Sequence, residues 1–330
     1  MIDTFAVVSG GSPDYLIDVV ADGLVRFLGR EKVYVSYSWH SKPYIPRSRL
    51  PNLYAITTAQ SNSISLMECQ ALVASFRVPI EKIREYKEKV GGVVAVVDGD
   101  DSGELKADYL KIADVYFKRE YFKSGKYPVE MLTKISRALP RGGRLVPHYY
   151  KRYPDKVFNL PLGVIPFDYG LGNSGLEKTG NLFFAGNDTS EIRKQLKEAI
   201  IKRESDGYSY MPNALNMSDY AAEISKHWIC VAPRGSGWDT YRYWEIPYIA
   251  SVLLCQESPL KIDYDFVHEE SCLRFSNVNE AMCLVEEYLK KKDKLSNIAA
   301  KGNELVMKNH LSIHRANRVW KAVNDIKRSS

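Results

Sequence analysis

Short apolar-rich runs recur along this chain. Between them lie segments whose apolar residues have helical spacing. Residues 93–97 (VVAVV) form the clearest run of the first half, and residues 181–185 and 228–232 form two in the second half. Uninterrupted apolar runs are typical of strands buried on both faces, whereas half-exposed strands alternate. We therefore predict an α/β protein built from parallel sheets with helices on both faces.

The pattern changes near residues 160–180, where proline and glycine are frequent. A chain of 330 residues is long enough for two domains of ordinary size, so we place the linker here. Two successive doubly wound units predict a cleft between them, because such sheets bind ligands beyond the carboxyl ends of their strands. Within the first unit we also expect a strand over 53–58 and a helix over 63–76.

Composition and the start of the chain narrow the class of protein. No segment approaches the roughly 18 consecutive apolar residues that a transmembrane helix needs. Residues 1–10 carry an acid where a secretory signal carries basic residues. The five cysteines are an odd number without CxxC spacing, which favours free thiols in a reducing compartment. We expect a soluble cytoplasmic protein, and peripheral attachment to a membrane stays open.

The most informative segment, residues 230–245, runs from an apolar strand through a glycine-containing turn into a helix. Gly235 and Gly237 let the backbone approach an anion closely. The start of the following helix adds unpaired N–H donors with partial positive charge. Asp239 can cap that helix by accepting a bond from its first amides. The segment therefore predicts an anion-binding turn.

Two charged side chains follow on the same helix. Arg242 and Glu245 are three residues apart and share one helical face. A planar guanidinium suits a diphosphate because it donates bidentately, and a carboxylate one turn away suits the paired hydroxyls of a ribose or a sugar. Together they match a nucleotide-diphosphate sugar. From spacing alone, a capped helix with an internal Arg–Glu ion pair is an equal alternative.

The segment resembles the donor site of bacterial exostosin-like and glycosyltransferase family 1-type proteins with the GT-B fold. Their pattern is a strand, Pro-x-Gly-x-Gly-x-Asp, and then Arg-x-x-Glu on a helix. The matching residues, all in register, are Pro233, Gly235, Gly237, Asp239, Arg242 and Glu245. The resemblance covers roughly residues 92–320, and it is closest over 230–246.

This resemblance implies a GT-B fold, with two facing Rossmann-like doubly wound domains and a cleft between them. It implies an acceptor-binding domain at residues 1–167, joined by the last helix at 313–330, and a donor-binding domain at 168–312. No cofactor or metal is required, and the co-substrate is a nucleotide-sugar, with UDP- or GDP-sugar preferred. The donor-binding residues that we predict are Gly186, Asn187, Arg193, Arg234, Gly235, Ser236, Gly237, Asp239, Arg242 and Glu245.

Three acids, Asp98, Asp100 and Asp101, directly follow the apolar run at 93–97. Acids beyond the end of a parallel strand face the ligand edge, where a general base takes the proton of an acceptor hydroxyl. The same residues spell Asp-x-Asp, which binds a divalent metal in GT-A transferases. We favour one of the three as a catalytic base, because the donor motif lies in a separate domain. A metal-dependent GT-A transferase using Asp98 and Asp100, and a solvated turn, remain alternatives.

Residues 118–156 carry eleven Lys or Arg residues against three acidic ones, a local charge of +8 in a chain of net charge +6. Basic residues interleaved with aromatic rings can neutralise phosphates and stack on bases or sugars. We therefore predict a polyanionic acceptor, either DNA or a phosphate-bearing glycan or lipid. Solvated helix faces are the alternative. The acceptor-binding residues that we predict are Gly11, Ser12, Lys118, Arg119 and His148.

These features predict a glycosyltransferase that moves a sugar from a nucleotide-sugar to an acceptor hydroxyl. The acceptor is a surface glycan, a lipid-linked glycan or a modified DNA base. A non-catalytic nucleotide- or polyanion-binding module of the same fold is the alternative from a different functional class. Such a module binds nucleotides without turnover, whichever acceptor is supplied.

Overall fold

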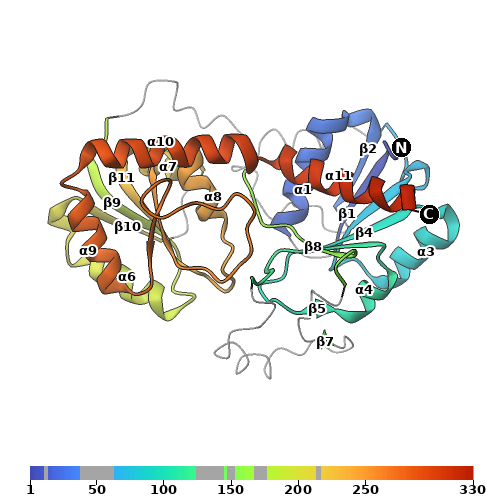
Figure 1. The fold of residues 1–330 in the computed structure, drawn as a ribbon, viewed down its shortest axis with the longest axis horizontal. Coiled ribbons are helices and arrows are strands. Elements are labelled where there is room, and N and C mark those ends of the chain that lie inside the picture. Colours follow the sequence, from blue (N-terminus) through green and yellow to red (C-terminus); the bar gives the residue numbers. More distant parts are fainter. Residues whose placement is uncertain are drawn as a thin grey trace. The chain divides into compact units, whose positions relative to one another are not determined.

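The computed structural model describes residues 1–10, 14–37, 63–123, 145–146, 153–166, 177–212 and 217–329. They form two compact units, each built on its own parallel sheet (Figure 1). The first unit comprises Met1–Ile165, Pro259–Lys261 and Ser312–Ser330, and the second comprises Pro166–Ser258 and Ile262–Leu311. The chain thus leaves the first unit, builds the second, and returns to the first for its last helix.

Six parallel strands form the sheet of the first unit, in the order β2-β1-β3-β4-β6-β8. They are β1 (Phe5–Ser9), β2 (Val33–Tyr37), β3 (Ala71–Ser75), β4 (Val93–Asp98), β6 (Val115–Lys118) and β8 (Val157–Asn159). A separate antiparallel pair joins β5 (Leu105–Lys106) and β7 (Leu145–Val146). The central strands β3 and β4 are buried on both faces, and their residues are apolar except for Ser75 and Asp98 at their ends. The predicted parallel α/β arrangement is confirmed.

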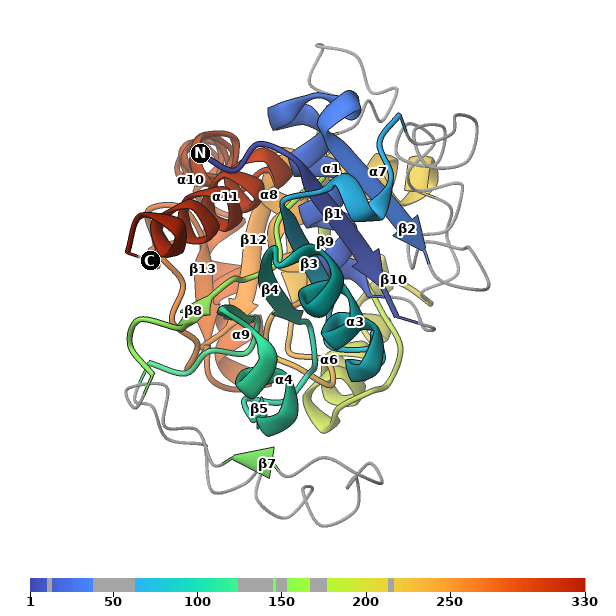
Figure 2. The same ribbon diagram turned by 90° about the vertical axis from the view of Figure 1, so that its right-hand side faces the viewer.

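Helices cover both faces of this sheet (Figure 2). α1 (Tyr15–Leu28) and α11 (Ser312–Ser329) pack together on one face, and α3 (Ile80–Val90) and α4 (Ala107–Ile112) lie on the other. α1 begins where the Asp14 carboxylate accepts the Leu16 N–H at 3.1 Å. α3 ends at Gly91, whose φ of 66° is a left-handed conformation that glycine adopts without strain. Short 3-10 helices are η1 (Arg30–Lys32), η2 (Leu66–Glu68) and η4 (Glu204–Asp206).

The contact between α1 and α11 is closest at Gly23. A Cβ at this position would lie 2.1 Å from the carbonyl oxygen of Ser312, so a larger residue would displace the last helix. The adjacent Asp22 carboxylate is fully buried and accepts hydrogen bonds from the Ser312 hydroxyl and from Arg26. Burial raises the pKa of Asp22 despite both partners. This contact holds α11 in the first unit.

Five parallel strands form the sheet of the second unit, in the order β10-β9-β11-β12-β13. They are β9 (Gly180–Ala185), β10 (Tyr208–Met211), β11 (His227–Ala232), β12 (Val252–Gln256) and β13 (Leu273–Phe275). α6 (Glu191–Ile201) and α9 (Val278–Tyr288) cover one face, and α7 (Met217–Lys226), α8 (Tyr241–Tyr248) and α10 (Lys292–Asn309) cover the other (Figure 1). An apolar core formed by the sheet, α6, α9 and the start of α10 supports the loops at the sheet edge.

The helix predicted over 63–76 is wrong. The segment instead forms η2, where the Ser65 and Glu68 side chains make a reciprocal capping box, followed by β3. β3 pairs with β1 on one side and β4 on the other, so its backbone groups are satisfied by the sheet. This tertiary pairing outweighs the weak helical spacing of the apolar residues. The strand predicted over 53–58 lies outside the described residues.

Two of the predictions from composition concern membrane-spanning segments and cysteines. No described helix is both long and apolar enough to cross a membrane. All five cysteines are free thiols, and four of them are buried: Cys69, Cys230, Cys255 and Cys272. Burial raises the pKa of the Cys230 thiol to about 12, which keeps it protonated and unreactive at neutral pH.

Candidate functional site

Two loops leave the second sheet at the same edge. β9 continues into residues 186–190 before α6, and β11 continues into residues 233–240 before α8. β9 and β11 are neighbours and run parallel, so both loops start from their carboxyl ends. Open parallel sheets bind their ligands at this edge.

A buried arginine of α6 joins the two loops. The Nε of Arg193 donates to the carbonyl oxygen of Arg234 at 2.9 Å, and its Nη2 donates to that of Pro233 at 3.3 Å. Its Nη1 donates to the carbonyl oxygen of Asn187, in the other loop, at 3.4 Å. Arg193 is only 5% exposed. The sequence predicts it as a diphosphate ligand, whereas the structure places its guanidinium against the carbonyl groups of the loops.

Two glycines make room for this guanidinium. A Cβ on Gly235 would lie 3.0 Å from Nη2 of Arg193, whereas a Cβ on Gly186 would lie 3.2 Å from the Phe184 ring and 3.4 Å from Nη1. Among the described glycines, positive φ angles occur elsewhere, at Gly29, Gly91 and Gly207. Space beside Arg193, rather than an unusual backbone conformation, is therefore the reason for glycine at Gly235, whereas the Phe184 ring is the tighter neighbour of Gly186.

The turn after β11 is held by one hydrogen bond within it and one to β12. The N–H of Gly235 donates to the carbonyl of Gly237 at 2.9 Å, and the N–H of Arg234 donates to Oε1 of Gln256 at 3.3 Å. The N–H groups of Ser236 and Gly237 have no hydrogen-bond partner among the residues that the structure describes. Ser236 is exposed at the tip. The turn thus has two adjacent amide donors suited to an anion.

Two arginines of this segment lie against aromatic rings. The guanidinium carbon of Arg234 is 4.8 Å from the ring centroid of Trp238, and that of Arg242 is 4.8 Å from the ring centroid of Tyr241. Arg234 is half-buried and Arg242 is buried. Such cation–π contacts restrict each side chain to a narrow set of rotamers.

Asp239, which the sequence predicts as a cap, lies one residue before the N-cap position of α8. Thr240 occupies that position, and its own side chain makes no capping hydrogen bond. Oδ1 of Asp239 instead accepts a hydrogen bond from Nε1 of Trp244 at 2.7 Å. Trp244 is fully buried, so its indole N–H needs a partner, and Asp239 supplies it. Asp239 therefore fixes α8 to the turn through its second helical turn.

Arg242 and Glu245 lie in the first two turns of α8, and both are at least 95% buried. Their charges reach Tyr220 of α7, whose phenol pKa is raised by burial first and by Glu245 second. The Tyr220 hydroxyl has no hydrogen-bond partner among the described residues. Sequence reasoning missed Tyr220, because nothing in α7 marks one aromatic residue as facing the helix that carries the motif.

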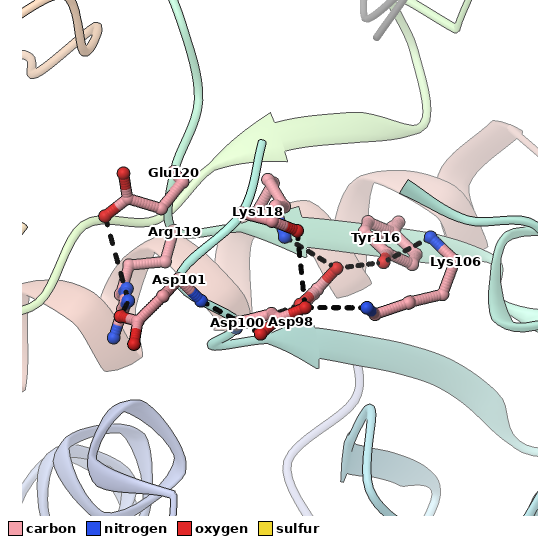
Figure 3. A network of polar contacts seen from close by, with 9 residues as sticks. Asp98, Asp100, Asp101, Lys106, Tyr116, Lys118, Arg119 and Glu120 are labelled. Atoms are coloured by element: carbon pink, nitrogen blue, oxygen red, sulfur yellow. Dashed lines mark hydrogen bonds and ion pairs between the residues drawn. The ribbon is translucent and has the colours of Figure 1, made fainter. Parts of the chain in front are cut away.

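The first unit holds a second polar cluster, at the carboxyl ends of β4 and β6 (Figure 3). Nζ of Lys118 lies 2.9 Å from Oδ2 of Asp98, and both side chains are fully buried. The Tyr116 hydroxyl, also from β6, donates to the same carboxylate. Burial raises the pKa of Tyr116 well above its usual value, and the charge of Asp98 adds to this.

Two predicted roles change because of this burial. The sequence predicts that Lys118 meets acceptor phosphates, but its ammonium group lies in the core and pairs with Asp98. Asp98 is one of the three predicted candidates for the base, but its carboxylate has no contact with solvent. Alternating strand geometry explains both: the last residues of β4 and β6 pair side by side in the sheet.

The other two acids have different surroundings. Asp100 lies 2.6 Å from Nζ of Lys106. Burial by itself would raise the pKa of Asp100, but the charges of Lys118 and Lys106 outweigh it, and the pKa is lowered. Asp101 has a side chain that is 52% exposed, and it pairs with Arg119, which is 10% exposed. Asp101 is thus the most accessible of the three acids.

Asp14 is a further acid of this cluster that sequence reasoning left out. Its Oδ2 accepts a hydrogen bond from the Ser75 hydroxyl at 2.7 Å, and a Cβ on Gly99 would lie 2.5 Å from its Oδ1. Burial raises the pKa of Asp14, partly offset by Ser75 and by Arg77 and Arg119. Its only sequence signal is its place before a helix, which is typical of a cap.

Several predicted residues cannot be placed. Gly11, Ser12, His148 and most of the basic segment at 118–156 lie outside the described residues. Among the described residues, no group of three or more His, Cys, Asp or Glu side chains is arranged to hold a metal ion.

Comparisons with known proteins show similarity in structure but not in sequence. No protein-family model matches the chain, and no curated protein matches it. Sucrose-phosphate synthase from Thermosynechococcus elongatus is 9% identical with a TM-score of 0.54, covering 99% of this chain and 100% of that one. An alpha-glucosyltransferase in complex with UDP is 12% identical with a TM-score of 0.59, covering 97% and 99%.

Two further structures are similar over the same length. HepE of Anabaena in complex with UDP is 8% identical with a TM-score of 0.59, covering 98% of this chain and 100% of that one. An alpha-glucosyltransferase with UDP and a 13-mer DNA containing a HMU base is 11% identical with a TM-score of 0.56, covering 98% and 100%. The chain therefore has the GT-B fold, with two Rossmann-like α/β domains, as the motif at 230–245 predicts.

Proposed function

From the GT-B fold of this chain, we propose that it is a nucleotide-sugar-dependent glycosyltransferase whose second unit binds the donor. The observation that carries the proposal is the loop edge of the second sheet. There, a turn with two adjacent amide donors is followed by Arg242 and Glu245 one helical turn apart. A nucleoside diphosphate offers matching groups, since its phosphates accept hydrogen bonds and its ribose carries paired hydroxyls.

Each group of the donor has a candidate partner. The Arg242 and Arg234 guanidinium groups neutralise the diphosphate, and the amides of Ser236 and Gly237 donate to its oxygens. The Glu245 carboxylate accepts from the hydroxyls of the ribose or of the donor sugar. Gly186 and Asn187 shape the adjoining loop, and Asp239 holds α8 in place through Trp244.

We take a UDP-sugar as the first candidate donor. Both the alpha-glucosyltransferase and HepE, which share this fold, are known in complex with UDP. A GDP-sugar is the second candidate, because the partners proposed above bind the diphosphate and the ribose or sugar hydroxyls rather than the base. The two donors differ in the base and share the diphosphate, so the roles of Arg242 and Arg234 are the same for both.

For the base we select Asp101 from the three acids at 98–101. The Asp98 carboxylate is enclosed by Lys118 and Tyr116. Asp100 and Asp101 each pair with one cation, and Asp101 is the more exposed of the two. In an inverting reaction, the acceptor oxygen attacks the anomeric carbon while its proton passes to Asp101. The bond from the anomeric carbon to the diphosphate breaks, and the nucleoside diphosphate leaves with the electron pair.

The acceptor in this proposal is a polyanion, either DNA or a phosphate-bearing glycan or lipid, and the first unit binds it. The support is the basic segment 118–156 together with a structural relative that holds DNA. Lys118 does not contribute, since it is buried, and Arg119 is paired with Asp101. The charge for acceptor binding would come from the remaining basic residues of the segment.

A screen of nucleotide-sugars tests the proposal. UDP-, GDP-, ADP-, CMP- and dTDP-sugars are added to the protein, and the melting temperature is measured, since a ligand of the folded state raises it. A rise with one nucleotide class, and its loss in Arg242→Ala, supports a donor site at this edge. No rise with any of them overturns it. Binding without release of nucleotide, whichever acceptor is supplied, favours the non-catalytic module instead.

A further inference from the structure

We infer that Arg193 is a positioning residue, which fixes the two donor-facing loops relative to each other without touching the diphosphate. The inference rests on the proposed function, because it concerns the same edge of the second sheet. In this inference, one side chain of α6 supports both the β9–α6 loop and the β11–α8 loop.

The geometry of the guanidinium is the first argument. Each of its three nitrogens donates to a backbone carbonyl: Nε to Arg234, Nη2 to Pro233 and Nη1 to Asn187. The Arg234 carbonyl also accepts a hydrogen bond from the Ser190 hydroxyl at 3.1 Å. One planar group thus spans from the loop after β9 to the turn after β11. A lysine cannot reproduce this, because an ammonium is a point donor without the fork.

Burial and packing are the second argument. Arg193 is 95% buried, and Gly235 packs against its Nη2. Any side chain larger than hydrogen at Gly235 would have to displace the guanidinium by a few tenths of an ångström. The motif's first glycine therefore depends on Arg193, which lies in a different element and 42 positions earlier in the chain.

The consequence for binding is indirect. The amides of Ser236 and Gly237 sit in the turn whose preceding carbonyls Arg193 holds. If the turn moves by about 1 Å, these donors and Arg234 lose their alignment. Misplacements of this size can lower a reaction rate by about a hundredfold. Arg193 also keeps a positive charge beneath an anion-binding turn, which a neutral replacement would remove.

Arg193→Lys separates positioning from charge, because it retains the charge but not the fork. UDP affinity is measured by calorimetry, and the melting temperature is measured beside it. We expect UDP affinity to fall by about tenfold to a hundredfold, the range for losing one hydrogen bond to a charged group, with the KM for the donor raised more than the KM for the acceptor. Lys194→Ala, which removes an exposed cation from the same helix, should leave both unchanged.

A double-mutant cycle with Gly235→Ala distinguishes positioning from direct contact. If Gly235 is a glycine because of Arg193, the alanine costs affinity in the native background and adds little to Arg193→Lys, so the two losses are not additive. If Arg193 contacts the diphosphate and Gly235 serves the anion separately, the losses add. Additive losses, or native affinity in Arg193→Lys, overturn the inference.

A further variant covers the case in which Arg193→Lys does not fold. Ser190→Ala removes the second hydrogen bond to the Arg234 carbonyl and leaves Arg193 in place. We expect about a threefold loss of UDP affinity, in line with one neutral hydrogen bond, and unchanged affinity would count against the inference. If the native protein binds no nucleoside diphosphate, the proposed function itself fails, and this result is distinct from both outcomes above.

Discussion

The ammonium nitrogen of Lys118 lies 2.9 Å from Oδ2 of Asp98, and neither side chain reaches solvent (Figure 3). The pair joins β6 to β4 at the ends of two neighbouring strands. A buried ion pair is costly to break by removing one partner, because the remaining charge is left in a low-dielectric surrounding.

Lys118→Met should therefore destabilise the first unit by about 3–5 kcal/mol. The measurement is urea unfolding of the full chain, followed by fluorescence. The matched control is Lys111→Met, which removes an exposed lysine whose nitrogen is 3.6 Å from Asp108. Such a surface pair contributes about 0–1 kcal/mol.

The double variant Asp98→Asn with Lys118→Met tests the cause. It removes both charges, so much of the lost stability should return. The recovery should be incomplete, because the Tyr116 hydroxyl then donates to a neutral amide oxygen instead of a carboxylate. A Lys118→Met protein as stable as the native one would show that the pair is not the reason for burying this lysine.

The parallel strands could be predicted because a strand buried on both faces has an uninterrupted apolar sequence. β4 and β11 have it, and both lie where the sequence predicts them. β3 has the same burial but is preceded by η2, and the polar residues before the strand give the segment 63–76 the spacing of an amphipathic helix. Only the pairing with β1 and β4, which is not local in sequence, decides in favour of a strand.

The candidate site was predictable in its positions but not in its contacts. The spacing of Gly235, Arg242 and Glu245 is visible in the sequence, because one turn and one helix carry all three. The sequence does not show that Arg193 lies against Gly235, since the two come from different elements. It also does not show that Lys118 is buried, because a lysine in a basic segment is more often exposed.

Arg242→Ala should weaken the binding of UDP by about 1.5–3 kcal/mol, which is roughly tenfold to 150-fold. The reason is the loss of a charge-assisted contact to the diphosphate. Calorimetry of UDP binding measures the effect, and the melting temperature without ligand separates it from unfolding, because Arg242 is buried. Lys226→Ala, an exposed cation of α7, is the control. Unchanged UDP affinity in Arg242→Ala would remove this arginine from the donor site.

Asp101→Asn should lower kcat by about 10²–10⁴ and leave the affinity for the donor within about twofold, as expected for a general base. Asp100→Asn, which loses its ion pair with Lys106, should have a smaller effect on kcat. Turnover should persist in EDTA. Loss of activity in EDTA, restored by manganese or magnesium, would instead indicate a metal-dependent reaction at these acids.

His227 should make the stability of the second unit depend on pH. Burial lowers its pKa below the ordinary 6.5, and its ring stacks on Phe183 with centroids 5.3 Å apart. The unfolded state therefore binds the proton more readily, so this contribution to stability is complete above pH 6.5 and is lost as the pH falls through the lower folded pKa.

His227→Gln removes that titration. The difference in the free energy of unfolding between the native protein and the variant should shrink as the pH falls from about 7.5 to about 5, in urea titrations at each pH. His268→Gln, at an exposed histidine, is the control and should follow the native protein. A difference that is constant over this range would mean that His227 is not held neutral by folding.

The polyanionic acceptor makes a prediction about salt. If the first unit binds duplex DNA through the basic residues of 118–156, log affinity should fall linearly with log salt concentration, by about 0.9 per neutralised phosphate. Fluorescence anisotropy at several salt concentrations measures the slope. Charge reversal at Lys151 and Arg152 should flatten it by about 2, whereas Lys291→Glu in the second unit should not change it. No binding at low salt would exclude DNA and leave a phosphate-bearing glycan or lipid. If the reversal variants also turned over every such acceptor at the native rate, the basic segment would have no part in acceptor binding.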